Sequence, residues 1–156
     1  MTRGSFRRAA LAGCAAVLLA AGPAVADGGR CGPDLLVRVK DPAPVHGGGQ
    51  TVVHSRVVNN GDAPTTTPFT LTIDLPPGVD IADPFPTANC QVFPFGHVLT
   101  CTYPAGLQPG GTVLAAFTIS VGNGMSAGSY PGSVHVDLPG DPTPNDDAAA
   151  FHITVL

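Results

Sequence analysis

The stretch that decides the fold reads FTLTIDLPPG, from Phe69 to Gly78. Its apolar residues fall at every second position up to Leu75, and polar residues stand between them. Successive side chains of a β-strand point to opposite faces, so this pattern predicts a strand with one buried face. The Pro-Pro-Gly that follows predicts a turn, because proline withholds a ladder donor and glycine accepts a positive φ.

The same alternation recurs on both sides of this stretch. Strands are predicted over residues 35–40, 113–121, 134–138 and 151–155, and a further strand over 52–58 has a less regular face. Turns rich in Gly, Pro, Asn and Asp separate them, and no amphipathic helical pattern intervenes. The sequence therefore predicts an all-β, two-sheet antiparallel Ig-like sandwich of about seven or eight strands, with a barrel as the alternative.

The first residues predict export. Three arginines precede an uncharged apolar run, Ala9–Ala21, which is shorter than the roughly 20 apolar residues of a membrane-spanning helix. Small residues at positions 24 and 26 then predict cleavage after Ala26, so residues 1–26 are read as a signal peptide. Lipid attachment at Cys14 and a twin-arginine signal at Arg7-Arg8 remain as alternatives.

The mature chain is expected to carry a short flexible leader over 27–33 and one Ig-like domain over 34–156, and no stable membrane span. It keeps four cations, Arg30, Arg38, Lys40 and Arg56, against eleven aspartates and no glutamate, so its net charge is 4 − 11 = −7. Nucleic acid is excluded as a partner, because binding it needs a basic surface that displaces counterions from phosphates. A secreted location, extracellular or loosely associated with the cell surface, follows from the signal peptide.

Three cysteines enter an oxidising compartment. Cys90 and Cys101 flank a segment that contains Phe-Pro-Phe-Gly at positions 93–96, which is typical of a hairpin tip, so a disulfide between them is predicted. Cys31 has three alternatives: it remains a reduced thiol, bridges two chains, or pairs with one of the other two. Aromatic residues at a constrained tip can anchor in a partner or fold back onto the core. The residues in question are Phe93 and Phe95.

Several turn motifs occur together in this chain. They are Val57–Pro64 before the strand at Phe69–Leu75, Pro76–Val79, the hairpin of Cys90 and Cys101 followed by Thr102–Pro104, Leu107–Gly111, Asp141-Pro142 and Asn145–Ala148. In this combination the chain resembles, from about Asp34 to Leu156, the bacterial Ig-like repeat family called domain of unknown function eleven. A close alternative is the bacterial cell-adhesion-related Ig-like domain. The resemblance implies a secreted or surface protein, used as a spacer or adhesive module, with no catalytic residues.

A group of oxygen-bearing side chains near one turn offers candidate calcium ligands. The competing interpretation is a polar connection whose Asx side chains cap their own turn. A separate metal hypothesis concerns His135 and His152, whose rings would lie close together if their strands were neighbours. The calcium candidates are Asp137, Asp141, Asn145, Asp146 and Asp147.

No catalytic motif is visible. The sequence contains no G-x-S-x-G, and without glutamate a carboxylate pair would require two aspartates brought together by the fold alone. We therefore expect no enzyme and no cofactor. The sequence predicts a non-catalytic module, structural or interacting with a protein or cell-wall partner at the bacterial surface. A calcium-binding adhesive module and a small secreted hydrolase or inhibitor are the alternatives.

Overall fold

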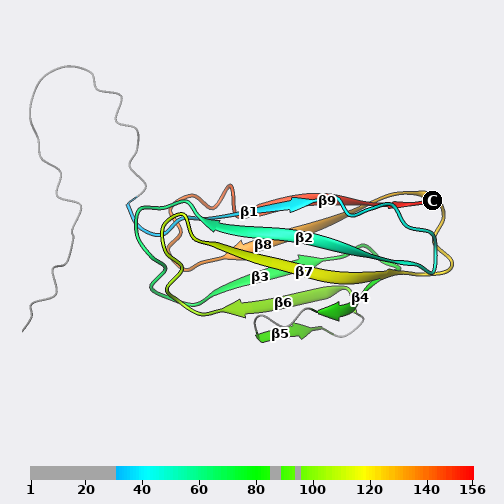
Figure 1. Ribbon diagram of the computed structural model, residues 1–156, viewed down its shortest axis with the longest axis horizontal. Helices are drawn as coiled ribbons and strands as arrows, with labels where there is room; N and C mark the ends of the chain where they lie inside the picture. The colour runs from blue at the N-terminus through cyan, green and yellow to red at the C-terminus, as the bar shows by residue number, and fades with distance from the viewer. Residues whose placement is uncertain (1–30, 85–88, 94–95) are drawn as a thin grey trace, which may run out of the picture.

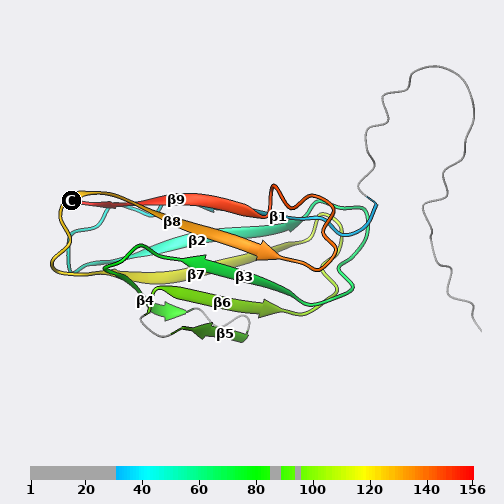
Figure 2. The ribbon, with the colours of Figure 1, turned by 180° about the vertical axis from the view of Figure 1, so that it is seen from behind.

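The computed structural model describes residues 31–84, 89–93 and 96–156, which form nine β-strands in two antiparallel sheets. Figures 1 and 2 show the two sheets packed face to face along their common long axis. This arrangement confirms the predicted all-β sandwich and excludes the barrel, because no strand is shared between the sheets. The predicted signal peptide and the first residues of the leader lie outside the described residues. No helix in the described ranges has the length and apolar character that a membrane span needs.

The two sheets have different sizes. The four-stranded sheet has the order β1 (Leu35–Lys40), β2 (Gln50–Asn59), β7 (Thr112–Val121) and β4 (Val79–Pro84). The five-stranded sheet has the order β5 (Asn89–Val92), β6 (Val98–Tyr103), β3 (Phe69–Asp74), β8 (Gly128–Asp137) and β9 (Ala148–Val155).

β4 is a strand that the sequence analysis did not predict. Its aspartates and its terminal Pro84 are residues that strands disfavour, and its register shifts between Ile81 and Asp83. In the sheet it pairs with β7 alone and so forms an edge, where proline and bulges are tolerated. β8 likewise starts at Gly128, well before the predicted residue 134, because Pro131 and Gly132 hide its alternation.

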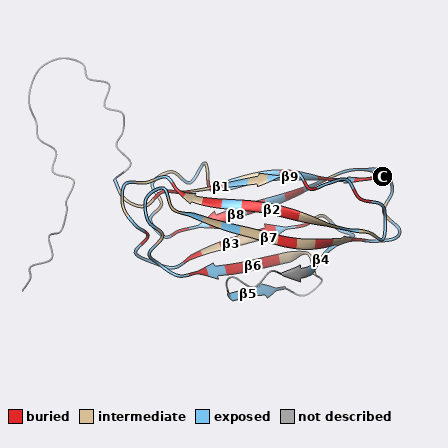
Figure 3. Cartoon of the chain, in the orientation of Figure 1, coloured by how far each residue is buried: buried red, intermediate tan, exposed pale blue. Residues whose placement is uncertain are grey.

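The core lies between the sheets and is built from the predicted inward rows. Phe69, Phe117 and Phe151 are at most 1% exposed and pack among valines, leucines and isoleucines from both sheets. Figure 3 shows buried and exposed residues alternating along the strands, as one-sided burial requires. Gly132 lies against Phe151, and a Cβ there would come within 2.5 Å of the ring, so this site needs glycine.

A buried asparagine holds one end of the sandwich together. The side-chain oxygen of Asn59 accepts hydrogen bonds from the backbone N–H groups of Asp34 (3.2 Å) and Gly61 (3.0 Å). Its amide nitrogen donates to the carbonyl oxygens of Ala63 and Leu107, each at 2.8 Å. The Asn59 side chain is fully buried, so these bonds satisfy its polar atoms and fix three loops against β2.

Candidate functional site

The β5–β6 hairpin carries the predicted disulfide. Cys90 and Cys101 are directly opposite each other in the strand register and form the bond. This pairing excludes the alternative in which Cys31 bonds to either of them, and Cys31 itself is exposed. Phe93 follows β5 and is 47% exposed, so it has not folded back into the core, whereas Phe95 lies outside the described residues. A partner contact through Phe93 stays a prediction.

The predicted calcium candidates differ in their exposure and in their hydrogen bonds. Asp137 and Asn145 are exposed, whereas Asp147 is buried. Asp141 accepts hydrogen bonds from the backbone N–H of Leu35 (2.7 Å) through Oδ2 and from that of Thr143 (2.8 Å) through Oδ1. The second bond is the predicted Asx turn, and the first attaches the β8–β9 connection to the start of β1.

Asp147 is the unusual member of this group. It is 4% exposed, and its Oδ1 has no hydrogen-bond partner. Burial, as the largest cause, and then the nearby carboxylates of Asp141, Asp146, Asp34 and Asp137 together raise the pKa of Asp147 to about 7. Across the described residues, no three His, Cys, Asp or Glu side chains are grouped so as to hold a metal ion. Calcium binding stays a prediction.

The histidine hypothesis fails on strand register. β8 and β9 are neighbours, as it required, and both histidines point outward. However, His135 pairs with Ala148, and His152 pairs with Pro131. The two histidines are therefore offset by four residues along the strands, or about 13 Å, which is too far for both rings to bind one metal ion.

A surface that the sequence analysis missed lies on the outer side of the four-stranded sheet. We call it the cation face, and its residues are Arg38, Lys40, His54, Arg56 and Leu114. Arg38 is directly opposite Arg56, and Arg56 is opposite Leu114, so these three residues form one row across β1, β2 and β7. The next row contains Lys40, His54 and Ala116. All five residues of the cation face are exposed, and Leu114 is 70% exposed.

The cations of this face have no anionic partners among the described residues. No ion pair in the described residues involves Arg38, Lys40 or Arg56. On the same side of the sheet, Asp80 pairs with His97 at 3.3 Å, three rows away from Arg56. The face therefore concentrates positive charge on a chain whose other charged side chains are mainly aspartates.

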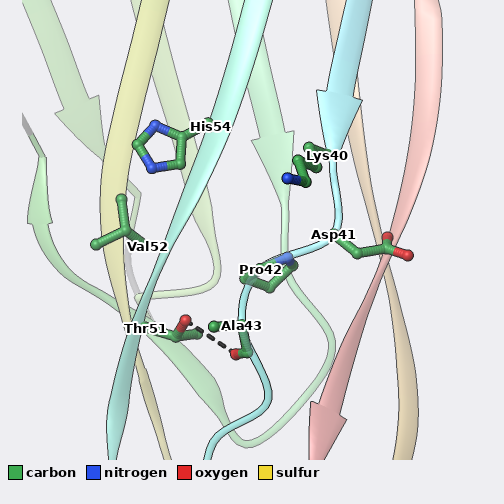
Figure 4. Close-up of a pocket in the computed structure, with 7 residues that line it drawn as sticks. All are labelled: Lys40, Asp41, Pro42, Ala43, Thr51, Val52 and His54. Atoms are coloured by element: carbon green, nitrogen blue, oxygen red, sulfur yellow. Dashed lines mark hydrogen bonds between the residues drawn. The ribbon is translucent and has the colours of Figure 1, made fainter.

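A hollow of about 430 Å³ adjoins the cation face. Figure 4 shows Lys40 and His54 on neighbouring strands, whereas the Asp41 side chain points away from them. Asp41 is oriented by a hydrogen bond that its Oδ1 accepts from the backbone N–H of His152 at 2.7 Å. The hollow is lined by Lys40, Asp41, Pro42, Ala43, Thr51, Val52 and His54.

Part of this surface could have been found from the sequence. Alternation places Arg38 and Lys40 on the same face of one predicted strand, and His54 and Arg56 on the same face of a second predicted strand. That the two pairs share one surface follows only from the pairing of β1 with β2. Leu114 joins them through β7, from a part of the chain that is distant in sequence.

No model of a known protein family matches this sequence, and no curated protein sequence matches it either. Solved structures do resemble the fold. The CARDB domain of a Pyrococcus furiosus protein, solved with di-metal ions, is 18% identical and has a TM-score of 0.55, with 79% of this chain and 93% of that chain covered. The third ScaC cohesin of Acetivibrio cellulolyticus, in complex with the ScaB dockerin, is 12% identical and has a TM-score of 0.60, with 78% and 99% covered.

A second cohesin, from an OlpA–dockerin complex of Clostridium thermocellum, is 9% identical and has a TM-score of 0.54, with 79% of this chain and 99% of that chain covered. At these identities the likeness establishes the fold alone. At the level of the fold, the CARDB likeness is consistent with the cell-adhesion-related domain that was the alternative resemblance, whereas the first resemblance, to domain of unknown function eleven, stays a prediction. The chain is thus similar in fold to CARDB and cohesin β-sandwich domains.

Proposed function

We propose that the mature chain is a secreted, non-catalytic Ig-like module that binds a protein partner at the bacterial surface through the cation face. The observation that carries this proposal is the row of Arg38, Arg56 and Leu114, in which charged and apolar side chains lie exposed and the two arginines have no ion-pair partner within the described ranges. Arginine is enriched among the residues that supply binding energy in protein interfaces, and an exposed leucine beside it adds apolar area that a partner can bury.

Two further observations support the setting. The disulfide between Cys90 and Cys101 is of a kind that persists in oxidising compartments. The solved CARDB domain and cohesins share the fold, and the cohesin structures hold a dockerin as their protein partner. A binding role for this chain is consistent with both.

The test immobilises three forms of the chain and compares which surface proteins of the producing bacterium each form retains. They are the wild-type chain, a variant with Arg38→Gln, Lys40→Gln and Arg56→Gln, and a control with exposed residues of the five-stranded sheet replaced. A protein retained by the wild type and the control, and lost from the cation-face variant, supports the proposal. Equal retention by all three rejects the cation face as the binding surface. The control substitutions are Thr102→Gln, Ser133→Gln and Thr154→Gln.

The export part of the proposal has its own test. The intact mass of protein purified from culture medium should correspond to a chain that begins at Asp27 and carries one internal disulfide. A mass that retains the first residues, or one that carries a lipid on Cys14, would contradict ordinary cleavage after Ala26. A broad screen for hydrolase activity on the same preparation would expose a catalytic function.

A further inference from the structure

We infer that the partner meets the cation face with an acidic, extended segment, whose carboxylates bind Arg38, Arg56 and Lys40 and whose apolar side chain enters the adjoining hollow. This inference rests on the proposed function and specifies the chemistry of the partner. Its starting point is charge complementarity. Three of the four cations of the mature chain lie on two neighbouring strands, whereas that chain carries a net charge of −7.

The row of arginines favours carboxylates as the binding groups. Like charges directly opposite each other on neighbouring strands destabilise a sheet, and Arg38 and Arg56 occupy such positions with no anion between them in the described residues. A carboxylate accepts two parallel hydrogen bonds from the planar guanidinium group. One acidic side chain placed between the two arginines would thus relieve their repulsion and gain charge-assisted hydrogen bonds.

The apolar parts of the surface favour a protein segment over an anionic polymer without apolar side chains. Leu114 stands 70% exposed beside Arg56, at one end of the cation face. At the other end, the hollow has Pro42, Ala43 and Val52 beneath Lys40 and His54. A polyphosphate or an acidic polysaccharide offers nothing that would bury these apolar groups, whereas a peptide with an apolar residue near its carboxylates does.

The spacing of the face sets the length of the segment. Leu114 lies in the row of Arg56, and Val52 of the hollow lies four residues along β2 from Arg56. At about 3.3 Å per residue this separation is about 13 Å, which an extended segment of about five residues spans. The segment therefore needs apolar residues near its two ends and acidic residues between them.

The experiment titrates the whole mature protein with synthetic peptides and follows its backbone amide signals by NMR. The probe is Gly-Leu-Glu-Glu-Glu-Leu-Gly, with Gly-Gly-Glu-Glu-Glu-Gly-Gly and inorganic polyphosphate as comparisons. We expect the leucine peptide to shift signals of β1, β2 and β7. Arg56→Gln should weaken its binding about tenfold, and Leu114→Ser about fivefold. Ser133→Gln, on the opposite sheet, should leave the affinity unchanged.

A second measurement separates binding from folding. Because Arg56 faces another arginine, Arg56→Gln should keep or raise the melting temperature while it weakens binding, which a purely structural role would not produce. Equal affinity for the two peptides, or for polyphosphate, would overturn the inference in favour of a general polyanion site. If no peptide binds, while a natural partner is retained by the wild type and lost from the cation-face variant, the inference fails and the proposed function stands.

Discussion

Replacing Asp147 by asparagine should stabilise the protein at neutral and alkaline pH. The Asp147 carboxyl is 4% exposed, and its Oδ1 has no hydrogen-bond partner. Burial and the carboxylates around it raise its pKa from the ordinary value of 3.8 to about 7. The folded state therefore disfavours the charged form, and ionisation at high pH costs stability.

The size of the effect follows from the two pKa values. A change from 3.8 to about 7 corresponds to about 4 kcal/mol, at about 1.4 kcal/mol for each tenfold change in proton affinity. Interactions of charged groups in proteins correspond to an effective dielectric constant well above that of a dry interior, so we expect about 1–2 kcal/mol in practice. The side-chain amide that Asp147→Asn introduces can also donate to the neighbouring carboxylates.

The sign of the pH dependence is fixed by the raised pKa. Well below the unfolded pKa of 3.8 the group is protonated in both the folded and the unfolded chain, and its penalty is absent. Between about pH 4 and pH 7 the unfolded chain loses this proton first, so the free energy of unfolding falls as the pH rises. Above pH 7 the full penalty is present, and Asp147→Asn should show its largest gain.

Urea unfolding at pH 4, 6 and 8 measures this difference. The free energies of unfolding of the wild type and Asp147→Asn should differ least at pH 4, where the penalty has only begun to appear, and separate by about 1–2 kcal/mol at pH 8. Asp74→Asn is the control, because it makes the same charge change at an exposed position of β3. A gain at pH 8 that Asp74→Asn reproduces, or a loss in Asp147→Asn, would refute the reasoning.

Three further predictions concern other parts of the chain. Asn59→Ala should lower the free energy of unfolding by about 2–4 kcal/mol, because it leaves buried backbone groups without hydrogen-bond partners. Thermal melts measure the loss, and Asn60→Ala, at the exposed neighbouring position, is the control that should leave the melting temperature unchanged. Replacing Cys90 and Cys101 by serine should lower the free energy of unfolding by about 3 kcal/mol, and reduction of the disulfide in the wild type should lower it by the same amount. If the calcium-binding alternative is right, millimolar calcium raises the melting temperature of the wild type and not of Asp141→Asn; an unchanged wild-type value rejects it.

The strands were predictable where burial alone determines the sequence. From Phe69 to Leu75 every inward residue is apolar, and the structure buries each of them. β2 was harder to assign, because two of its inward positions are the polar Ser55 and Asn59. Ser55 donates to the Ala115 carbonyl oxygen at 3.3 Å, and Asn59 finds its partners in three separate loops. The partners Ala115, Asp34 and Leu107 are distant in sequence, so no local pattern reveals that these positions are buried.

Sites that depend on the pairing register of the strands could not be predicted from the sequence. Alternation gave the correct outward direction for His135 and His152, and the chelation hypothesis still failed, because the pairing of β8 with β9 offsets them. The same limit hid the cation face. The meeting of Arg38 with Arg56 depends on the pairing register of β1 and β2, which a shift of one residue would abolish.

The two sheet surfaces differ in what a partner could add to them. On the five-stranded sheet, the outward residues of β3 and β6 are mainly threonines, and the hydroxyls of Thr72 and Thr100 lie 3.4 Å apart, close enough to bond each other. An uncharged hydroxyl group that hydrogen-bonds to water in the unbound protein gains little free energy when a partner replaces that water. On the four-stranded sheet, Arg38 and Arg56 repel each other until an anion arrives. Because binding energy comes from interactions that the unbound surface lacks, the cation face gains more from a partner than the threonine surface does.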